Sequence, residues 1–207
     1  SEMCIRDRPW TLKFLWSPFL EMFKTKKFFV VLTQMVTGAG FALVALALQL
    51  PFFFAICIAL LAVIAFSGAT HDVATDGVYM SELNKQDQAK YIGWQGAFYN
   101  IAKIVASGGL VWLAGALLVG FGGVEGATEA VRHEATRHAW MTVMLILAAV
   151  MLLLGFYHMR MLPSGGAAAS GAKSARETWE QLVAVIKDFF LKKHIWYLSL
   201  IHISEPT

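Results

Sequence analysis

The chain has 207 residues, of which 57% are hydrophobic and only 15% charged, with a formal net charge of +3 and a mean hydropathy of +0.59. This composition is too apolar and too poor in charge for an ordinary soluble domain. We therefore expect an integral membrane protein whose surroundings are a lipid bilayer, with no nucleic acid as a partner.

The two ends carry one DNA word on opposite strands. Met3–Arg8 can be encoded by ATG TGT ATA AGA GAC AG, and the reverse complement of that DNA encodes Leu198–His202. The word resembles a transposon-based sequencing adapter, so residues 1–8 and 198–207 are interpreted as translated adapter around a metagenomic fragment; a real inverted repeat is the alternative. Without Cys4, Cys57 is left with no disulfide partner and no set of metal ligands.

Four apolar runs have the length of about 20 residues that a helix needs to cross a bilayer. They are Phe28–Leu48, Phe52 to about Asp72, Ile92–Val119 and Trp140–Tyr157. A strand of a membrane barrel would be shorter and would alternate polar and apolar residues. The sequence therefore predicts an all-α, polytopic bundle of membrane helices.

A charged turn precedes the first of these runs. It contains Glu21, Lys24, Lys26 and Lys27, and its lysines favour the cytoplasmic side. Within the run, Gly38, Gly40, Ala42 and Ala45 are small residues of the kind that lets helices approach closely, although they are equally compatible with plain filler. The segment Gln49–Pro51 is predicted to be a tight outer turn.

The second run continues without a proline or a loop signal into His71, Asp72 and Asp76. On a helix, the two aspartates lie on one face because they are four residues apart. Facing lipid would cost them several kcal/mol, so we expect them to line an ion or substrate pathway. In the alternative, the membrane ends near Thr70 and the acids lie among the lipid headgroups.

The third run begins after the polar segment Asn84–Lys90, in which Asn84 or Asp87 is expected to cap the helix. The first half of this helix holds polar side chains that must face something other than lipid: Gln95, Tyr99, Asn100 and Lys103. Measured from the cytoplasmic ends of their helices, Lys103 is about 16 Å deep and Asp72 about 10 Å. We expect these two side chains to face each other or to share a water-filled cavity.

The remaining segments are more polar. Glu125–His138 is predicted to be a solvated loop, and its histidines, five residues apart, do not have the spacing of four that a helical zinc site requires. Residues 161–193 are predicted to be a linker followed by an amphipathic helix on the membrane surface, from Arg176 to Lys193. Residues 194–197 would begin another span.

The distribution of the 17 Lys and Arg residues indicates the orientation. Two lie in the first end segment, Lys103 lies within a span, and only Arg132 and Arg137 fall on the side of the Glu125–His138 loop. The remaining 12 lie on the opposite side, which the positive-inside bias assigns to the cytoplasm.

Three stretches together resemble a known family. The turn from Trp16-Ser17-Pro18 to Lys27, the stretch FSGATHDVATDG at Phe66–Gly77 and the stretch FYNIA at Phe98–Ala102 are similar to the major facilitator superfamily, in particular to its anhydromuropeptide permease and acetyl-coenzyme A transporter group. The resemblance implies a twelve-helix transporter in two halves. Residues 9–160 would hold the end of helix 2 and helices 3 to 6, residues 161–193 the central cytoplasmic loop, and residues 194–197 the start of helix 7. Glu21 stands where the family usually has Asp, and Asn100 where Arg is expected.

The leading hypothesis is a secondary transporter of the bacterial inner membrane that moves a polar solute by alternating access, with protons as the coupling ion. Buried carboxylates suit this role, because burial raises the pKa of a carboxyl group toward neutrality and a nearby cation lowers it. Proton binding can therefore follow the conformation of the transporter. The resemblance implies a muropeptide as the solute, with a peptide, a sugar conjugate or an acyl-coenzyme A as alternatives. No cofactor is expected, and the remainder of its own chain is an expected partner.

Two other classes of function are the alternatives. A membrane-embedded enzyme would need a nucleophile and a base or a metal set within the spans. The candidate pair for that is His71 and Asp72, and neighbouring residues on a helix point about 100° apart, so no enzymatic activity is expected. A sensor or scaffold built on a transporter fold remains open from sequence.

Overall fold

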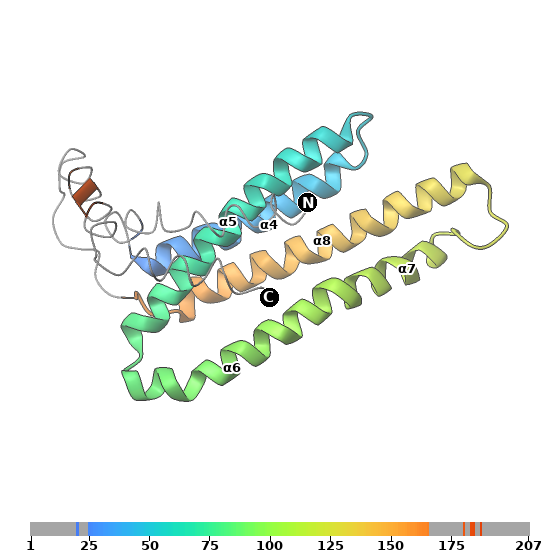
Figure 1. The fold of residues 1–207 in the computed structure, drawn as a ribbon. Helices are drawn as coiled ribbons and strands as arrows, with labels where there is room; N and C mark the ends of the chain where they lie inside the picture. The colour runs from blue at the N-terminus through green and yellow to red at the C-terminus, as the bar shows by residue number, and fades with distance from the viewer. Residues whose placement is uncertain (1–19, 21–24, 166–179, 181–182, 185–186, 188–207) are drawn as a thin grey trace.

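The computed structural model describes residues 20, 25–165, 180, 183–184 and 187. This part of the chain is all helical, with the elements α4 (Lys26–Ala47), α5 (Phe53–Glu82), α6 (Lys85–Ile104), η2 (Val105–Gly109), α7 (Leu110–Gly120) and α8 (Glu129–Met161). The π-helical turn η2 joins α6 and α7 into one continuous helix, Lys85–Gly120. Four helices in the described part are thus long and apolar enough to cross a membrane, as the sequence predicts (Figure 1).

Several predicted features lie outside the described residues. They are the two end segments 1–8 and 198–207, Glu21 and Lys24 of the charged turn, the start of a further span at 194–197, and most of the linker and amphipathic helix at 161–193.

Helix α4 lies between α5 and α8 and packs along both of them (Figure 1). A Cβ atom at Gly38 would stand 2.8 Å from Cγ of Leu152 and 3.2 Å from the carbonyl oxygen of Ala148, both on α8. On the α5 side, a Cβ at Gly40 would stand 2.8 Å from Cγ1 of Ile64. These glycines therefore allow the close approach of helices, and the alternative that they are filler is excluded.

Helix α5 runs unbroken from the apolar run through Asp72 and Asp76 to Glu82, ten residues beyond the expected end of the span. Hydroxyl groups in its second half are satisfied within the helix, since Thr70 donates to the carbonyl of Phe66 and Ser81 to that of Gly77. The predicted continuity is confirmed. At about 1.5 Å per residue, the helix is about 45 Å long and exceeds the bilayer core of about 30 Å.

The prediction of a loop at Glu125–His138 is wrong for most of this segment, because α8 begins at Glu129. Glu129 lies in the first turn, where a negative charge complements the helix dipole. One turn further on, Glu134 contacts Arg137 at 3.4 Å and Nε2 of His138 at 3.7 Å, at the spacings of three and four residues that a helix surface supports. The polar residues in this stretch thus extend the helix by more than two turns.

In the helix formed by α6, η2 and α7, the α7 part packs on α8 and the α6 part is exposed. No residue of α6 is buried, and α7 buries only Ala114 against α8. Helix α6 begins after Asn84, which caps it as predicted: Oδ1 of Asn84 accepts a hydrogen bond of 2.9 Å from the backbone N–H of Asp87. Helix α6 therefore depends on its own backbone and its cap, with few contacts from the rest of the described chain.

The helices run alternately up and down. At one end, the backbone N–H of Lys27 donates to the carbonyl of Ser164 at 3.3 Å, and that of Gly165 donates to Oε1 of Glu82 at 2.8 Å. At the other end, the turn between α4 and α5 meets α8 through Gln49 and Met141. The first end is the one that the lysine distribution assigns to the cytoplasm.

Candidate functional site

Polar side chains are buried where α4 faces α5 and α8. Thr33, Gln34 and Thr37 of α4 and Ser67 and Thr70 of α5 are all buried. Together with His71 of α5 and His158 of α8, they form what we call the polar seam. Polar groups inside membrane spans are rare and concentrate at functional sites.

The α5 side of the seam is a short hydrogen-bonded chain. The Thr37 hydroxyl donates to Oγ of Ser67 at 3.0 Å, and the Ser67 hydroxyl donates to the carbonyl oxygen of Thr33 at 3.0 Å. The Thr33 hydroxyl donates to the carbonyl of Phe29 in its own helix at 2.7 Å. Each of these three hydroxyls therefore has an acceptor, and this side of the seam is satisfied.

The α8 side of the seam is a contact between Gln34 and His158. Nδ1 of His158 lies 2.9 Å from Nε2 and 3.0 Å from Oε1 of Gln34, so the histidine tautomer decides which of the two bonds forms. Gly155 makes the approach possible, because a Cβ there would stand 2.8 Å from Cε of Met35 and 3.5 Å from Cβ of Gln34. Gln34 is only 3% exposed, which removes water as an alternative partner.

His71 extends the seam on α5. Its Nδ1 contacts the Thr75 hydroxyl at 3.5 Å, the outer limit of a hydrogen bond, while its buried Nε2 has no hydrogen-bond partner among the residues that the structure describes. His71 lies within electrostatic range of His158 and of Asp72. A buried nitrogen without a partner is costly, so it marks a place where a proton, a water or a polar ligand atom would be stabilised.

The two carboxylates stand one turn apart on α5, as predicted. Asp72 and Asp76 are both half-buried, and each takes part in further interactions. Asp76 precedes Gly77, where a Cβ would stand 2.8 Å from Cδ of Lys26. The Lys26 side chain of the charged turn therefore packs against Gly77, the residue that follows the second aspartate.

The four predicted residues of α6 are exposed: Gln95, Tyr99, Asn100 and Lys103. Asn100 donates to the carbonyl of Gly96 in its own helix at 2.9 Å. Since α6 does not pack along α5, the described part of the chain does not bring Lys103 against Asp72. A shared pathway for the two groups stays a prediction.

Gln34 and His158 were missed by the sequence reasoning. Both carry the signal that singled out Asp72, namely a polar side chain inside or at the end of an apolar run. An uncharged amide costs less to place in a membrane than a carboxylate, so it is a weaker signal of a functional site. A histidine at the end of an apolar run is also typical of the membrane interface. Their contact could not be expected because it joins helices far apart in sequence.

The described residues contain no group of three or more His, Cys, Asp or Glu side chains that could hold a metal ion. The described part of the chain is that of a multi-pass membrane protein, with four helices long and apolar enough to cross a membrane and with polar side chains buried on α4 and α5. Comparison of the chain with protein-family models, curated proteins and solved structures finds no match.

Proposed function

We propose that these helices belong to a secondary transporter of the major facilitator superfamily in a bacterial inner membrane. It would move a polar solute, such as a muropeptide or a related conjugate, by alternating access with protons as the coupling ion. The observation that carries this proposal is the polar seam, in which His71 of α5 lies within electrostatic range of His158 of α8 and of Asp72, the next residue on α5.

The seam supports proton coupling because its groups belong to different helices. Gaining a proton at His71 or His158 changes an attraction or a repulsion across a helix contact, in a region where water screens poorly. Such a change biases the relative position of the helices that carry the groups, which is how local protonation drives a larger movement. Among the described residues, Nε2 of His71 has no hydrogen-bond partner, so it is available to bind or release a proton.

The exposed polar face of α6 supports the same proposal. A lysine facing the centre of a bilayer costs about 2.5–3.5 kcal/mol on insertion scales, and Lys103 is joined on α6 by Gln95 and Asn100. In a transporter, such side chains line a water-filled path between helices. We therefore expect this face to be turned toward a solute pathway that further helices complete.

The test is uptake of labelled muropeptide by cells that have no permease of their own and that express the transporter containing this chain. Asp72→Asn should abolish accumulation driven by a proton gradient, because a neutral amide cannot carry the coupling proton. Glu125→Gln, an exposed carboxylate in the loop before α8, is the matched control and should leave uptake unchanged.

Two results would count against the proposal. Accumulation that survives both Asp72→Asn and collapse of the proton gradient would exclude proton coupling at this site. Absence of uptake for muropeptides, peptides and acyl-coenzyme A alike, in a protein that inserts correctly, would favour the sensor or scaffold instead.

A further inference from the structure

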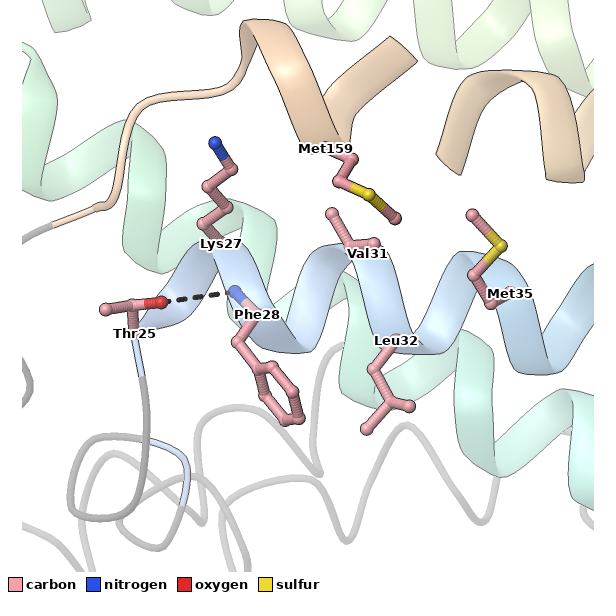
Figure 2. A pocket seen from close by; sticks show the side chains of 7 residues that line it. All are labelled: Thr25, Lys27, Phe28, Val31, Leu32, Met35 and Met159. Carbon is pink, nitrogen blue, oxygen red and sulfur yellow. Dashed lines mark hydrogen bonds between the residues drawn. The ribbon is translucent and has the colours of Figure 1, made fainter. Parts of the chain in front are cut away.

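An apolar groove lies along α4 and is closed on one side by α8. It has a volume of about 420 Å³ and is lined by Lys27, Phe28, Val31, Leu32 and Met35 of α4 and by Met159 of α8 (Figure 2). Phe28 is 44%, Leu32 42% and Met159 48% exposed, so the groove opens on the surface of the described bundle. In a bilayer, apolar side chains exposed in this way are in contact with lipid.

The groove has one polar end and one apolar end. Figure 2 shows Thr25 and Lys27 at one end of the row of lining residues and Met35 at the other. The Thr25 hydroxyl accepts from the backbone N–H of Phe28 at 3.3 Å, and Lys27 is the charged residue among those that line the groove. From Lys27 to Met35 the helix rises about 12 Å, close to the thickness of one leaflet of a 30 Å hydrocarbon core.

We propose that this groove binds one acyl chain of an anionic phospholipid, with the headgroup phosphate held by Lys27. The lining excludes a polar solute, and a free phosphate would leave the apolar length of the groove empty. The cation lies at the start of α4, at the end of the bundle assigned to the cytoplasm, where the leaflet carries anionic lipids. The positive end of the α4 helix dipole points toward the same headgroup.

The lining also favours a lipid over a further protein helix. Met35 and Met159 are flexible, unbranched side chains that adapt to a chain of variable conformation. A packed helix would instead seek small residues that let its backbone approach, and the groove is lined by Phe, Leu, Val and Met. The proposal does not depend on transport, because it uses none of the residues of the polar seam.

Native mass spectrometry of the whole chain, purified in detergent with either phosphatidylglycerol or phosphatidylcholine, tests the proposal. The unchanged chain should retain one tightly held phosphatidylglycerol in preference to phosphatidylcholine. Val31→Trp fills the groove and should reduce retention of both lipids by about tenfold, the factor that a loss of 1.4 kcal/mol produces. Lys27→Gln should remove the preference for the anionic lipid and leave phosphatidylcholine bound.

Two control variants are matched to these changes. Leu43→Trp adds the same bulk on an exposed position of α4 outside the groove, and Lys85→Gln removes an exposed cation at the same end of the bundle. Both should retain lipid as the unchanged chain does. Met159→Trp fills the groove from the α8 wall and serves if Val31→Trp lowers the helical content measured by circular dichroism.

Three results would overturn the proposal. Equal retention by the Val31→Trp, Met159→Trp and Leu43→Trp variants would show that no chain occupies the groove. An equal loss of preference in the Lys27→Gln and Lys85→Gln variants would reduce the effect to general surface charge. Displacement of phosphatidylglycerol by inorganic phosphate would show that the site recognises the anion without the acyl chain.

Discussion

The contact between Gln34 and His158 predicts a measurable coupling between α4 and α8. Interhelical hydrogen bonds in membranes average about 0.6 kcal/mol, with values up to about 1.7. Gln34 is 3% exposed, so losing its partner leaves an amide that water cannot reach, at a cost of about 1–3 kcal/mol. We expect His158→Leu alone to destabilise the chain by about that amount. In the Gln34→Leu/His158→Leu double variant, about 1 kcal/mol of the summed losses should be recovered.

The assay is a double-mutant cycle on the free energy of unfolding in detergent micelles, followed by circular dichroism during titration with a denaturing detergent. Gln49→Leu combined with Met141→Leu is the control, because that contact also connects the chain of α4 to α8, in the turn that follows α4, but it is exposed. We expect its coupling to be near zero. A coupling between Gln34 and His158 within about 0.3 kcal/mol of zero would refute the reasoning, because contacting residues should not behave additively.

Three further predictions concern the packing of α4, the cap of α6 and the topology of the chain. Gly38→Ala should lower stability by about 1–3 kcal/mol through overpacking against α8, whereas Gly96→Ala, with nothing within 4 Å, should raise thermal stability slightly; equal effects would contradict the close approach. Asn84→Ala should cost about 1 kcal/mol through loss of the α6 cap and speed amide hydrogen exchange in that first turn; unchanged exchange would contradict the cap. A cysteine at Glu129 should react with an impermeant reagent only from the outer side, and labelling from the cytoplasm alone would reverse the topology.

The helices themselves could be predicted because the bilayer fixes their length. Each of the four apolar runs became a helix of sufficient length, and the cap at Asn84 followed from local chemistry alone. The carboxylates of α5 were placed one turn apart in a continuous helix for the same reason. Features that depend only on residues close together in the sequence could thus be predicted.

The boundaries and the pairing could not be predicted in the same way. Polarity indicates contact with water, which a helix that extends past the membrane also has, and the segment from Glu129 to His138 was therefore mistaken for a loop. The π-helical turn at Val105–Gly109 leaves no periodic signal in a glycine-rich apolar stretch. The packing of α8 on α4 depends on the shapes of both surfaces, which no single segment contains.

The position of α4 between α5 and α8 has a consequence for the order in which the protein assembles during synthesis. Thr37 and its partner Ser67 are 30 residues apart, so this side of α4 is satisfied soon after α5 emerges. Gln34 and His158 are 124 residues apart. At about 5–20 residues per second, ribosomal synthesis takes about 6–25 seconds to supply that partner. During this interval, the Gln34 amide lies in the membrane on the open side of a two-helix hairpin. We expect this intermediate to be the one most exposed to misassembly and most in need of protection by the insertion machinery.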